Sequence, residues 1–351
     1  MNTTTNAMTN GDAAVTQAKV EPQMMQAIVQ SAYGSTDVLR FGQIARPAIA
    51  DNEVLVRTEA AGLDRGTWHL MAGRPYLMRV MGFGFSAPKN PVAGLDVAGT
   101  VAAVGAGVTR FKVGDAVFGI GQGSFAEYTK VREDKLAHKP ASLSFERAAI
   151  LGVSGGTALQ GVRAARIEAG QRVLVIGASG GVGTYAVQIA KARGAVVTAV
   201  CSTGKLELVR SIGADHAIDY TKTDFVDGAT KYDVIMDIGG NTPLGRLRRA
   251  LTPTGTLVFV GGENGGDWTA GFGRLLTALM LSPFVKQRFV PLGAREHHED
   301  LEELARLIEE GKVSPVLDRD RGWPLQEVPA AMEHLIAGRV RGKIAIRVGA
   351  Q

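Results

Sequence analysis

A glycine-rich turn between an apolar strand and a helix constrains this chain more than any other feature. The run VLVIGASGGVG (173–183) leads directly into the helical pattern of residues 182–195. Ala178, Gly180 and Gly183 stand at the spacing of a dinucleotide fingerprint, with alanine in the first place. A glycine at 180 lets a pyrophosphate approach the backbone, and Gly183 lets the helix pack closely on the sheet. The turn therefore predicts a dinucleotide site. The other residues expected to hold the anion at the helix start are Ser179, Gly181 and Val182.

The chain changes pattern twice along its length. Residues 24–135 read as short alternating or β-branched strands separated by turns, which predicts a small, mostly antiparallel barrel or sandwich. From 151 to 290 strands alternate with helices, which predicts a parallel, doubly wound sheet and an α/β fold. We therefore expect a β-rich domain over 24–150, completed by 291–351, and a nucleotide-binding domain over 151–290. Residues 1–23 are expected to be a flexible leader.

Composition limits the classes of partner and the location. The formal charge is +5, and the densest basic runs, 246–250 and 338–343, are too short to predict nucleic-acid binding. One cysteine, Cys201, excludes a disulfide framework and favours a cytoplasmic location. No run reaches the ~18 apolar residues that a membrane span needs. The N-terminus also lacks the pattern of a secretory signal.

The strand that follows the helix of residues 182–195 indicates, at its end, which dinucleotide is bound. NAD-binding chains usually carry an acidic residue there for the ribose 2′-hydroxyl. Here the strand ends AVCSTGKLE, whose first acid, Glu207, lies in the following helix. The hydroxyls of Ser202 and Thr203 and the ammonium of Lys205 suit a 2′-phosphate, so we expect NADP(H). Ser202 or Thr203 also fits an ordinary helix N-cap, and the two roles are compatible.

Several stretches resemble one protein family. They are AAGLDRGTWHL, NPVAGLDVAGTVAAVG, GSFAEYTKV and SIGADHAIDY, together with the glycine-rich run. From about residue 26 to the end, the chain resembles the medium-chain dehydrogenase/reductase superfamily, in its zinc-free quinone oxidoreductase-like branch. The resemblance implies a GroES-like catalytic domain with a Rossmann domain inserted into it, a cofactor in the cleft between them, and a homodimer.

The zinc ligands of related alcohol dehydrogenases are missing from this sequence. Those relatives place a Cys after the AAG strand and a His in a GHE motif, where this chain has Asp64 and Leu95. A leucine cannot replace an imidazole ligand. A single cysteine also excludes a four-cysteine structural zinc site. We therefore expect no metal.

The resemblance places Asp64, Arg65 and His69 at the mouth of the cleft. Arg65 matches a position that touches the cofactor pyrophosphate in some relatives, and His69 matches a proton-relay histidine. A histidine can donate the proton that follows hydride delivery; otherwise His69 is a surface residue of the following helix. Asp64 is either a catalytic acid or orienting group, or the N-cap of the helix that starts at Arg65.

Further cofactor contacts follow from the resemblance and from the sheet. Thr157 resembles the residue beside the nicotinamide, and Tyr220 matches a position near the adenine or the 2′-phosphate. Lys343 is either a cofactor contact from the C-terminal segment or a solvent-exposed lysine. Doubly wound sheets bind ligands at the carboxyl ends of their strands, which adds Gly240, Val260, Gly261 and Gly262.

Two apolar segments indicate the kind of substrate. Residues 76–90 are rich in Met and Phe, and residues 272–290 are strongly apolar. The second segment is either a core helix, or a pocket wall or weakly membrane-touching flap for hydrophobic molecules. Both segments favour a bulky, hydrophobic small-molecule substrate.

Together these patterns predict an NADPH-dependent, metal-free oxidoreductase that transfers hydride to a quinone or an α,β-unsaturated carbonyl compound. Conjugation in such an acceptor spreads the developing charge, which hydrogen-bond donors can stabilise. The alternatives are a zinc-independent alcohol or carbonyl oxidoreductase, an enoyl-thioester reductase, and an NADPH-binding protein with little turnover.

Overall fold

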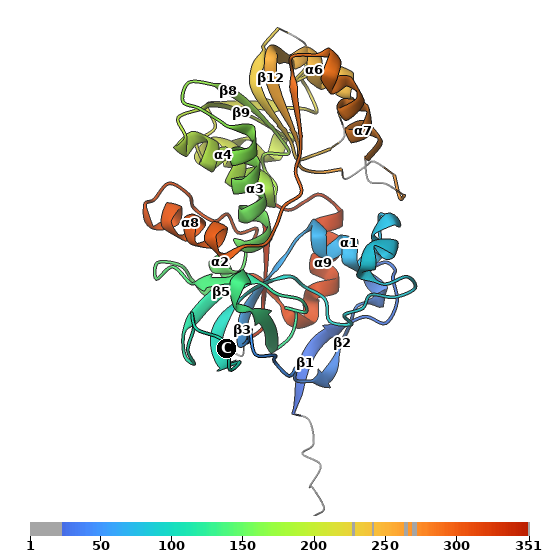
Figure 1. Cartoon of the computed structure of the whole chain (residues 1–351), viewed down its shortest axis with the longest axis vertical. Coiled ribbons are helices and arrows are strands. Elements are labelled where there is room, and N and C mark those ends of the chain that lie inside the picture. The colour runs from blue at the N-terminus through green and yellow to red at the C-terminus, as the bar shows by residue number, and fades with distance from the viewer. Residues whose placement is uncertain (1–22, 227–228, 241, 263–265, 269–271, 350–351) are drawn as a thin grey trace, which may run out of the picture.

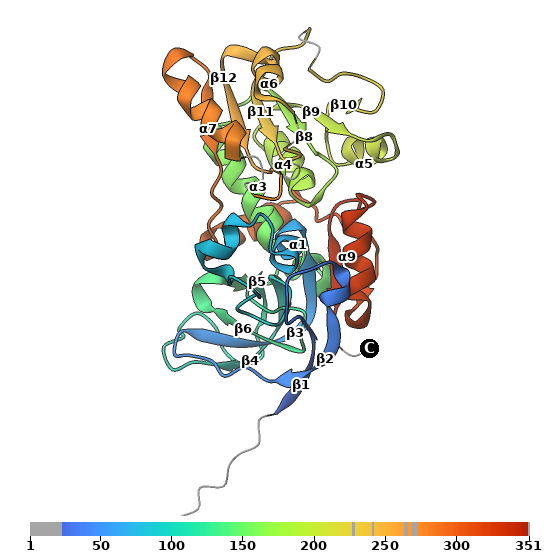
Figure 2. The same ribbon diagram turned by 90° about the vertical axis from the view of Figure 1, so that its right-hand side faces the viewer.

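The chain folds into two lobes stacked along its long axis (Figure 1). The lower lobe contains the first strands and the C-terminal end, and the middle of the chain forms the upper lobe (Figure 2). The flexible leader expected over 1–23 lies, apart from Gln23, outside the described residues. The computed structural model describes residues 23–226, 229–240, 242–262, 266–268 and 272–349.

The lower lobe is built mainly from antiparallel strands. They are β1 (Met24–Val29), β2 (Arg40–Ala45), β3 (Glu53–Leu63), β4 (Asp96–Val104), β5 (Ala116–Ile120), β6 (Tyr128–Arg132), β7 (Leu136–His138), β14 (Trp323–Pro324) and β15 (Ile344–Arg347). A seven-stranded sheet has the order β14-β15-β3-β4-β5-β7, with β6 paired to β3, and β1 pairs with β2. Strand β3 serves two cores. Val54 and Val56 pack with β4 and β5, whereas Ala61 and Leu63 pack with α9 (Val328–Ile336).

The upper lobe is a parallel sheet between helices. Its strands are β8 (Arg172–Ile176), β9 (Val196–Cys201), β10 (His216–Asp219), β11 (Tyr232–Asp237), β12 (Leu251–Phe259) and β13 (Arg288–Pro291). They pair in parallel in the order β10-β9-β8-β11-β12-β13, which is the strand order of a Rossmann fold. The expected α/β fold, with a GroES-like β domain and a Rossmann domain, is confirmed.

Alternate residues of β8 face the two helical layers. Val173 and Val175 pack in one apolar cluster, and Leu174 and Ile176 pack in the other. The helices of the first layer include α4 (Gly181–Ala192) and α5 (Leu206–Ser211), and those of the second are α6 (Leu244–Ala250) and α7 (Phe272–Leu281). Such two-sided burial explains why this strand is continuously apolar.

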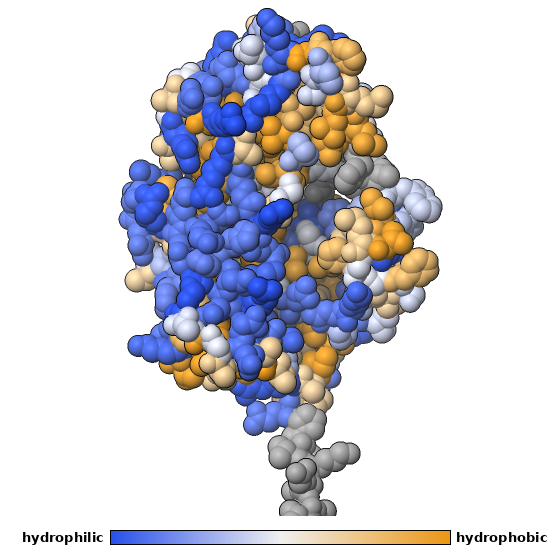
Figure 3. Space-filling model, viewed as in Figure 1, coloured by the Kyte–Doolittle hydropathy of each residue, from blue (hydrophilic) through white to orange (hydrophobic). Residues whose placement is uncertain are grey.

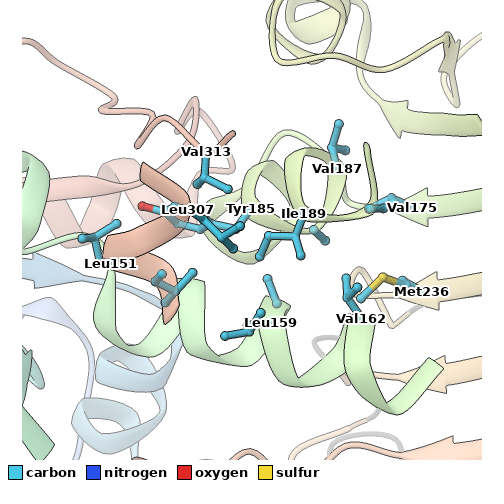
Figure 4. Packing of buried hydrophobic residues seen from close by; sticks show 14 of the residues in the cluster. Leu151, Leu159, Val162, Val175, Tyr185, Val187, Ile189, Met236, Leu307 and Val313 are labelled. Atoms are coloured by element: carbon cyan, nitrogen blue, oxygen red, sulfur yellow. The ribbon is translucent and has the colours of Figure 1, made fainter. Parts of the chain in front are cut away.

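One long helix joins the two lobes. Helix α3 (Gly152–Ala165) follows the short α2 (Phe145–Ala148) and packs on α4, on the sheet and on α8 (His298–Glu309), as Figure 4 shows. Its glycines are roughly 1 kcal/mol less favourable each in a helix than alanine, so α3 is not predicted from the sequence. Two of them lie where neighbouring side chains approach closely: a Cβ on Gly155 would lie 2.9 Å from the end of the Leu304 side chain, and one on Gly161 would lie 2.9 Å from the end of the Met236 side chain.

Helix α7 shows that the core-helix interpretation of residues 272–290 is wrong. Leu276 and Met280 are 57% and 78% exposed, and only one face of the helix, which includes Ala278, packs on the sheet. Arg274 ties the helix to the carboxyl edge of the sheet through an ion pair with the buried Asp237 (2.8 Å). Within the described residues, no helix combines the length and the apolar character that crossing a membrane requires.

Candidate active site

The glycine-rich turn joins β8 to α4, with Gly180 as the N-cap of the helix. A Cβ placed on Gly180 would lie 3.6 Å from its nearest neighbour, the Gly177 carbonyl oxygen, so packing does not require a glycine there. A Cβ on Gly183 would instead overlap Gly177 and Ala178. Gly183 therefore serves the packing of the turn, whereas Gly180 leaves room in front of a helix N-terminus, which fits the phosphates of a dinucleotide.

Two further strand ends meet this turn at the carboxyl edge of the sheet. The Gly239 N–H donates to the carbonyl oxygen of Ile176 at the end of β8 (3.2 Å). Gly240 has a φ of +71°, and a Cβ there would lie 2.8 Å from the Gly261 carbonyl group. These glycines let the ends of β11 and β12 approach each other. The residues predicted to bind cofactor at this edge, Gly240, Val260, Gly261 and Gly262, therefore follow adjacent strands.

Two cations flank the loop after β9, where an adenosine 2′-phosphate is expected. The Lys205 ammonium donates to the Gly338 carbonyl oxygen (2.9 Å), and burial lowers its pKa. The Arg341 guanidinium donates to the Gly204 carbonyl oxygen (2.6 Å). Sequence reasoning does not single out Arg341. In the sequence Arg341 is marked only by its place in the short basic run 338–343, and only the fold brings that run to this loop.

The same loop has an acidic neighbour that sequence reasoning also misses. Asp219, at the end of β10, accepts hydrogen bonds from the hydroxyls of Thr203 and Thr221, and these bonds lower the pKa of its carboxyl group. Ser202 precedes a short 3-10 helix but makes no side-chain capping bond, so it does not act as the expected N-cap. Tyr220 is 56% exposed beside Asp219.

Asp64 caps helix α1 (Arg65–Ala72), as one of its two interpretations predicts. Its Oδ1 accepts from the backbone N–H of Thr67 (2.9 Å) and from the Thr67 hydroxyl (3.2 Å). Its Oδ2 accepts from the Lys343 ammonium (3.1 Å). Both oxygens of this buried carboxylate therefore have partners, so Asp64 also orients a neighbour.

Lys343 is buried, so its interpretation as a solvent-exposed lysine is wrong. The side chain is 2% exposed and forms ion pairs with Asp64 and with the fully buried Asp96. Asp96 is a residue that sequence reasoning misses, because its partners lie far away in the chain. The neighbouring Gly342 N–H donates to the Ser179 carbonyl oxygen (2.9 Å), which places Lys343 against the glycine-rich turn.

His69 lies on the last turn of α1 and lines a cavity. Its Nδ1 lies 2.7 Å from the carbonyl oxygen of Arg74. A carbonyl oxygen only accepts, so Nδ1 carries the proton and Nε2 is the nitrogen left for proton exchange. The ring stands edge-on to Trp68, with the ring centres 4.8 Å apart.

Arg65 and Thr157 each donate to a backbone carbonyl oxygen. The Arg65 guanidinium donates to the carbonyl oxygen of Leu335 on α9 (3.5 Å), and the Thr157 hydroxyl donates to the carbonyl oxygen of Val153 within α3 (2.7 Å). The cofactor roles of these two residues stay predictions.

A cavity of about 810 Å³ lies next to α1 in the lower lobe. Figure 3 shows hydrophobic surface on this side of the molecule, over α7 and, below it, over the lower lobe. The segment 76–90 reaches the upper lobe, where the Tyr76 ring packs edge-on against Trp268 (5.3 Å between centres). The apolar side chains that line the cavity include Leu70, Met78, Met81, Phe83, Val92, Leu95 and Ile120.

Comparisons with known proteins decide the family. Residues 50–141 match the family model of the alcohol dehydrogenase GroES-like domain, and residues 212–346 match that of zinc-binding dehydrogenase. A 2-methylene-furan-3-one reductase of Solanum lycopersicum is 34% identical over 97% of this chain and 84% of its own length. This chain belongs to the medium-chain dehydrogenase/reductase superfamily, in its quinone oxidoreductase-like branch.

Two other proteins narrow the chemistry of this medium-chain reductase. An NADPH-dependent alkenal/one oxidoreductase of Arabidopsis thaliana is 36% identical over 93% of this chain and 80% of its own length. The structure of Escherichia coli quinone oxidoreductase complexed with NADPH has a TM-score of 0.79 and 26% identity, and covers 92% of this chain and 99% of that one. The protein is an NAD(P)H-dependent oxidoreductase. The homodimer and the cytoplasmic location stay predictions.

Zinc does not fit the residues of this medium-chain reductase at the expected ligand positions. Asp64 uses both oxygens on Thr67 and Lys343, and Leu95 has no donor atom. In the part of the chain that the structure describes, no group of three or more His, Cys, Asp or Glu side chains is arranged to hold a metal ion. These positions therefore do not offer zinc a ligand set.

Replacing Gly180 by aspartate tests whether the turn binds the dinucleotide. Aspartate is a good N-cap and is favourable at a helix N-terminus, but its charge repels a pyrophosphate. Gly180→Asp should leave the melting temperature unchanged or raised and increase the Kd for NADPH by about a hundredfold or more. NADPH fluorescence titration and thermal unfolding measure the two effects.

Gly183→Ala is the matched control for the same turn. Its Cβ overlaps the Gly177 carbonyl oxygen, so this variant should lower the melting temperature. Unchanged NADPH binding in Gly180→Asp would show that the dinucleotide does not lie on this turn.

Proposed function

We propose that this reductase transfers hydride from NADPH to a quinone or an α,β-unsaturated carbonyl compound without a metal ion. The observation that carries the proposal is the cavity of about 810 Å³ beside α1, whose wall is largely apolar. Its size fits a small-molecule site. The names of the tomato and Arabidopsis relatives describe reductases of conjugated carbonyl compounds, which supports the same class of acceptor.

The polar groups on the cavity wall suit an acceptor of this kind. They include the amides of Asn90 and Gln122, which are hydrogen-bond donors of modest strength, and His69, whose Nε2 donates when the ring is protonated. Charged side chains such as Lys89 also line the cavity. When bound, NADPH supplies the hydride. Conjugation spreads the charge that develops on a quinone or enone, so such donors can stabilise it. An alkoxide concentrates charge on one oxygen, which favours a Lewis acid.

A panel of acceptors tests the proposed substrate class. Quinones and enones should oxidise NADPH, followed at its absorbance band, at rates at least about tenfold above those of saturated aldehydes and alcohols. Pre-treatment with a chelator should leave these rates unchanged. Faster turnover of an enoyl-thioester or a saturated carbonyl compound would refute the assignment, and loss of activity with the chelator would refute the metal-free reaction.

The preference for NADPH over NADH is proposed to come from the loop after β9. Lys205 and Arg341 bring two positive charges to Gly204 and its neighbours. Strand β9 ends without an acidic residue, and Asp219, a carboxylate beside this loop, is already bonded to two hydroxyls. This arrangement favours a 2′-phosphate over a 2′-hydroxyl.

Lys205→Glu should narrow the difference between the two cofactors. The unaltered protein should bind NADPH more than about tenfold more tightly than NADH, because a charge-assisted bond contributes at least that much. The glutamate should weaken NADPH binding and leave NADH binding nearly unchanged in fluorescence titrations. Lys231→Glu, next to the amino end of β11, is the matched control. Equal affinities in the unaltered protein would refute the 2′-phosphate site.

The protonated form of His69 is the proposed proton donor: Nδ1–H stays bonded to the Arg74 carbonyl oxygen, Nε2 gives up its proton to leave a neutral ring, and the ring lines the cavity. His69→Gln should lower kcat by about a hundredfold while the Kd for NADPH stays unchanged. Stopped-flow absorbance and fluorescence titration separate the two quantities. His216→Gln, on the distant strand β10, should leave both unchanged. A normal kcat in His69→Gln would assign the proton to another group.

A further inference from the structure

A buried cluster of three charged side chains lies against the glycine-rich turn. The Lys343 ammonium contacts Oδ2 of Asp64 (3.1 Å) and Oδ2 of Asp96. The stem of Lys343 passes Gly181, since a Cβ on that residue would lie 3.6 Å from the lysine Cδ. Gly342 also bonds to the turn through Ser179. The cluster therefore stands directly behind the helix N-terminus that faces the proposed pyrophosphate site.

The cluster does not balance its own charge. Two carboxylates share one ammonium, so the net charge is −1 when both are ionised and zero when one holds a proton. Burial, with the help of Asp64, raises the pKa of Asp96 to about 7 in spite of the attraction of Lys343. The carboxylates of Asp64 and Asp96 raise the pKa of the Lys343 ammonium, so the lysine stays charged. The proton that titrates near neutral pH is therefore the one on the carboxylates.

The other polar groups around Asp96 leave this balance unchanged. The backbone N–H of Val153, at the start of α3, donates to Oδ1 of Asp96 (2.7 Å). Tyr185 of α4 is buried, which raises its pKa well above the usual value and keeps it neutral. Arg147 of α2 donates instead to the Pro315 carbonyl oxygen (3.1 Å). The glycines Gly62 and Gly152, which enclose Asp96, carry no charge.

The geometry points to Asp64, Lys343 and Asp96 as a positioning cluster that takes up one proton when the dinucleotide binds to the adjacent turn. A pyrophosphate carries two negative charges, and a buried anion behind it is poorly screened by salt. Binding is therefore more favourable when the cluster is neutral, and by linkage binding raises the proton affinity of the cluster. This inference rests on the proposed placement of the cofactor on the turn.

The sign of the pH dependence follows from the same linkage. Below the pKa of the free cluster the proton is already present, and cofactor affinity is at its full value. Between that pKa and the higher pKa of the complex, each binding event takes up a proton, so the affinity for NADPH falls as the pH rises. Above the pKa of the complex no proton is taken up, and the affinity stays at its lower value. The Kd for NADPH should therefore rise by about sixfold between pH 6.5 and pH 8.5 if binding raises the pKa by about one.

Calorimetry measures the proton directly. Titrating NADPH into the protein at pH 7.5, in phosphate and in Tris, gives the number of protons taken up from the buffer. The unaltered protein should take up about half a proton more than Asp96→Asn, whose cluster is neutral without a proton. Asp64→Asn also leaves one carboxylate for one ammonium and should lose the same uptake. Each asparagine keeps an oxygen for the backbone N–H of Thr67 or Val153 but loses the oxygen that accepts from Lys343. The 2′-phosphate of NADPH titrates equally in every variant.

Asp215→Asn is the matched control. Asp215 pairs with Lys191 near the far end of α4, so this variant should retain the full uptake. If the cluster had only a structural role, its variants would change the free energy of unfolding but not the number of protons taken up when NADPH binds. Equal uptake in the unaltered protein and in both cluster variants, or equal loss in Asp215→Asn, would overturn the inference. NADPH binding that survives Gly180→Asp would instead show that the proposed placement of the cofactor is wrong.

Discussion

One buried cation holds the C-terminal segment against two other segments of the lower lobe. Lys343 bonds to Asp64 at the start of α1 and to Asp96 at the start of β4, while the backbone of the preceding residue bonds to the glycine-rich turn of the upper lobe. An intact buried ion pair adds little stability, because desolvation offsets the attraction, but removing one partner costs about 3–5 kcal/mol. The main effect of the cluster is therefore to fix which segments meet. Any arrangement that separates the C-terminal segment from α1 leaves buried carboxylates unpaired.

Glycines at the junction make this arrangement possible. A Cβ on Gly62 would lie 2.9 Å from Oδ2 of Asp96, and a Cβ on Gly152 would lie 2.5 Å from its Oδ1. Gly342 has a φ of +79°, and a Cβ there would overlap Val316. These three residues belong to β3, α3 and the segment before β15. Side chains at these positions would force the carboxylates and the lysine apart. The charged cluster can therefore form only if these three positions are glycine.

The parts of the fold that sequence reasoning predicts are those with local signals. The glycines of the turn around Gly180 have a recognisable spacing. The apolar residues that follow repeat alternately with the period of a strand and with that of a helix, and this alternation of strands and helices predicts a parallel sheet. Helix α3 is missed because its glycines serve contacts with Leu304 and Met236 that only the tertiary structure shows.

The buried cluster is missed for the same reason. Lys343 lies 279 residues from Asp64 and 247 residues from Asp96 in the chain. An isolated lysine in a sequence is more often exposed, and no local pattern distinguishes this one. Arg341 likewise reaches the loop after β9 across 137 residues. The glycine-rich turn is thus predictable from its own residues, whereas the buried charges and the arginine that lie near it are not.

The same cluster explains how the protein accommodates a buried carboxylate beside the cavity. Asp64 stands where zinc-dependent relatives carry a metal ligand, and a buried carboxylate needs a cation nearby. Lys343 supplies that cation from within the protein, and Thr67 uses the remaining oxygen. The carboxylate is thereby satisfied by groups of the protein itself, beside a cavity whose wall is largely apolar but also carries charged side chains such as Glu53 and Lys89. Asp64 is thus not available to hold a metal ion, which is why the proposed acceptor is one that develops delocalised charge.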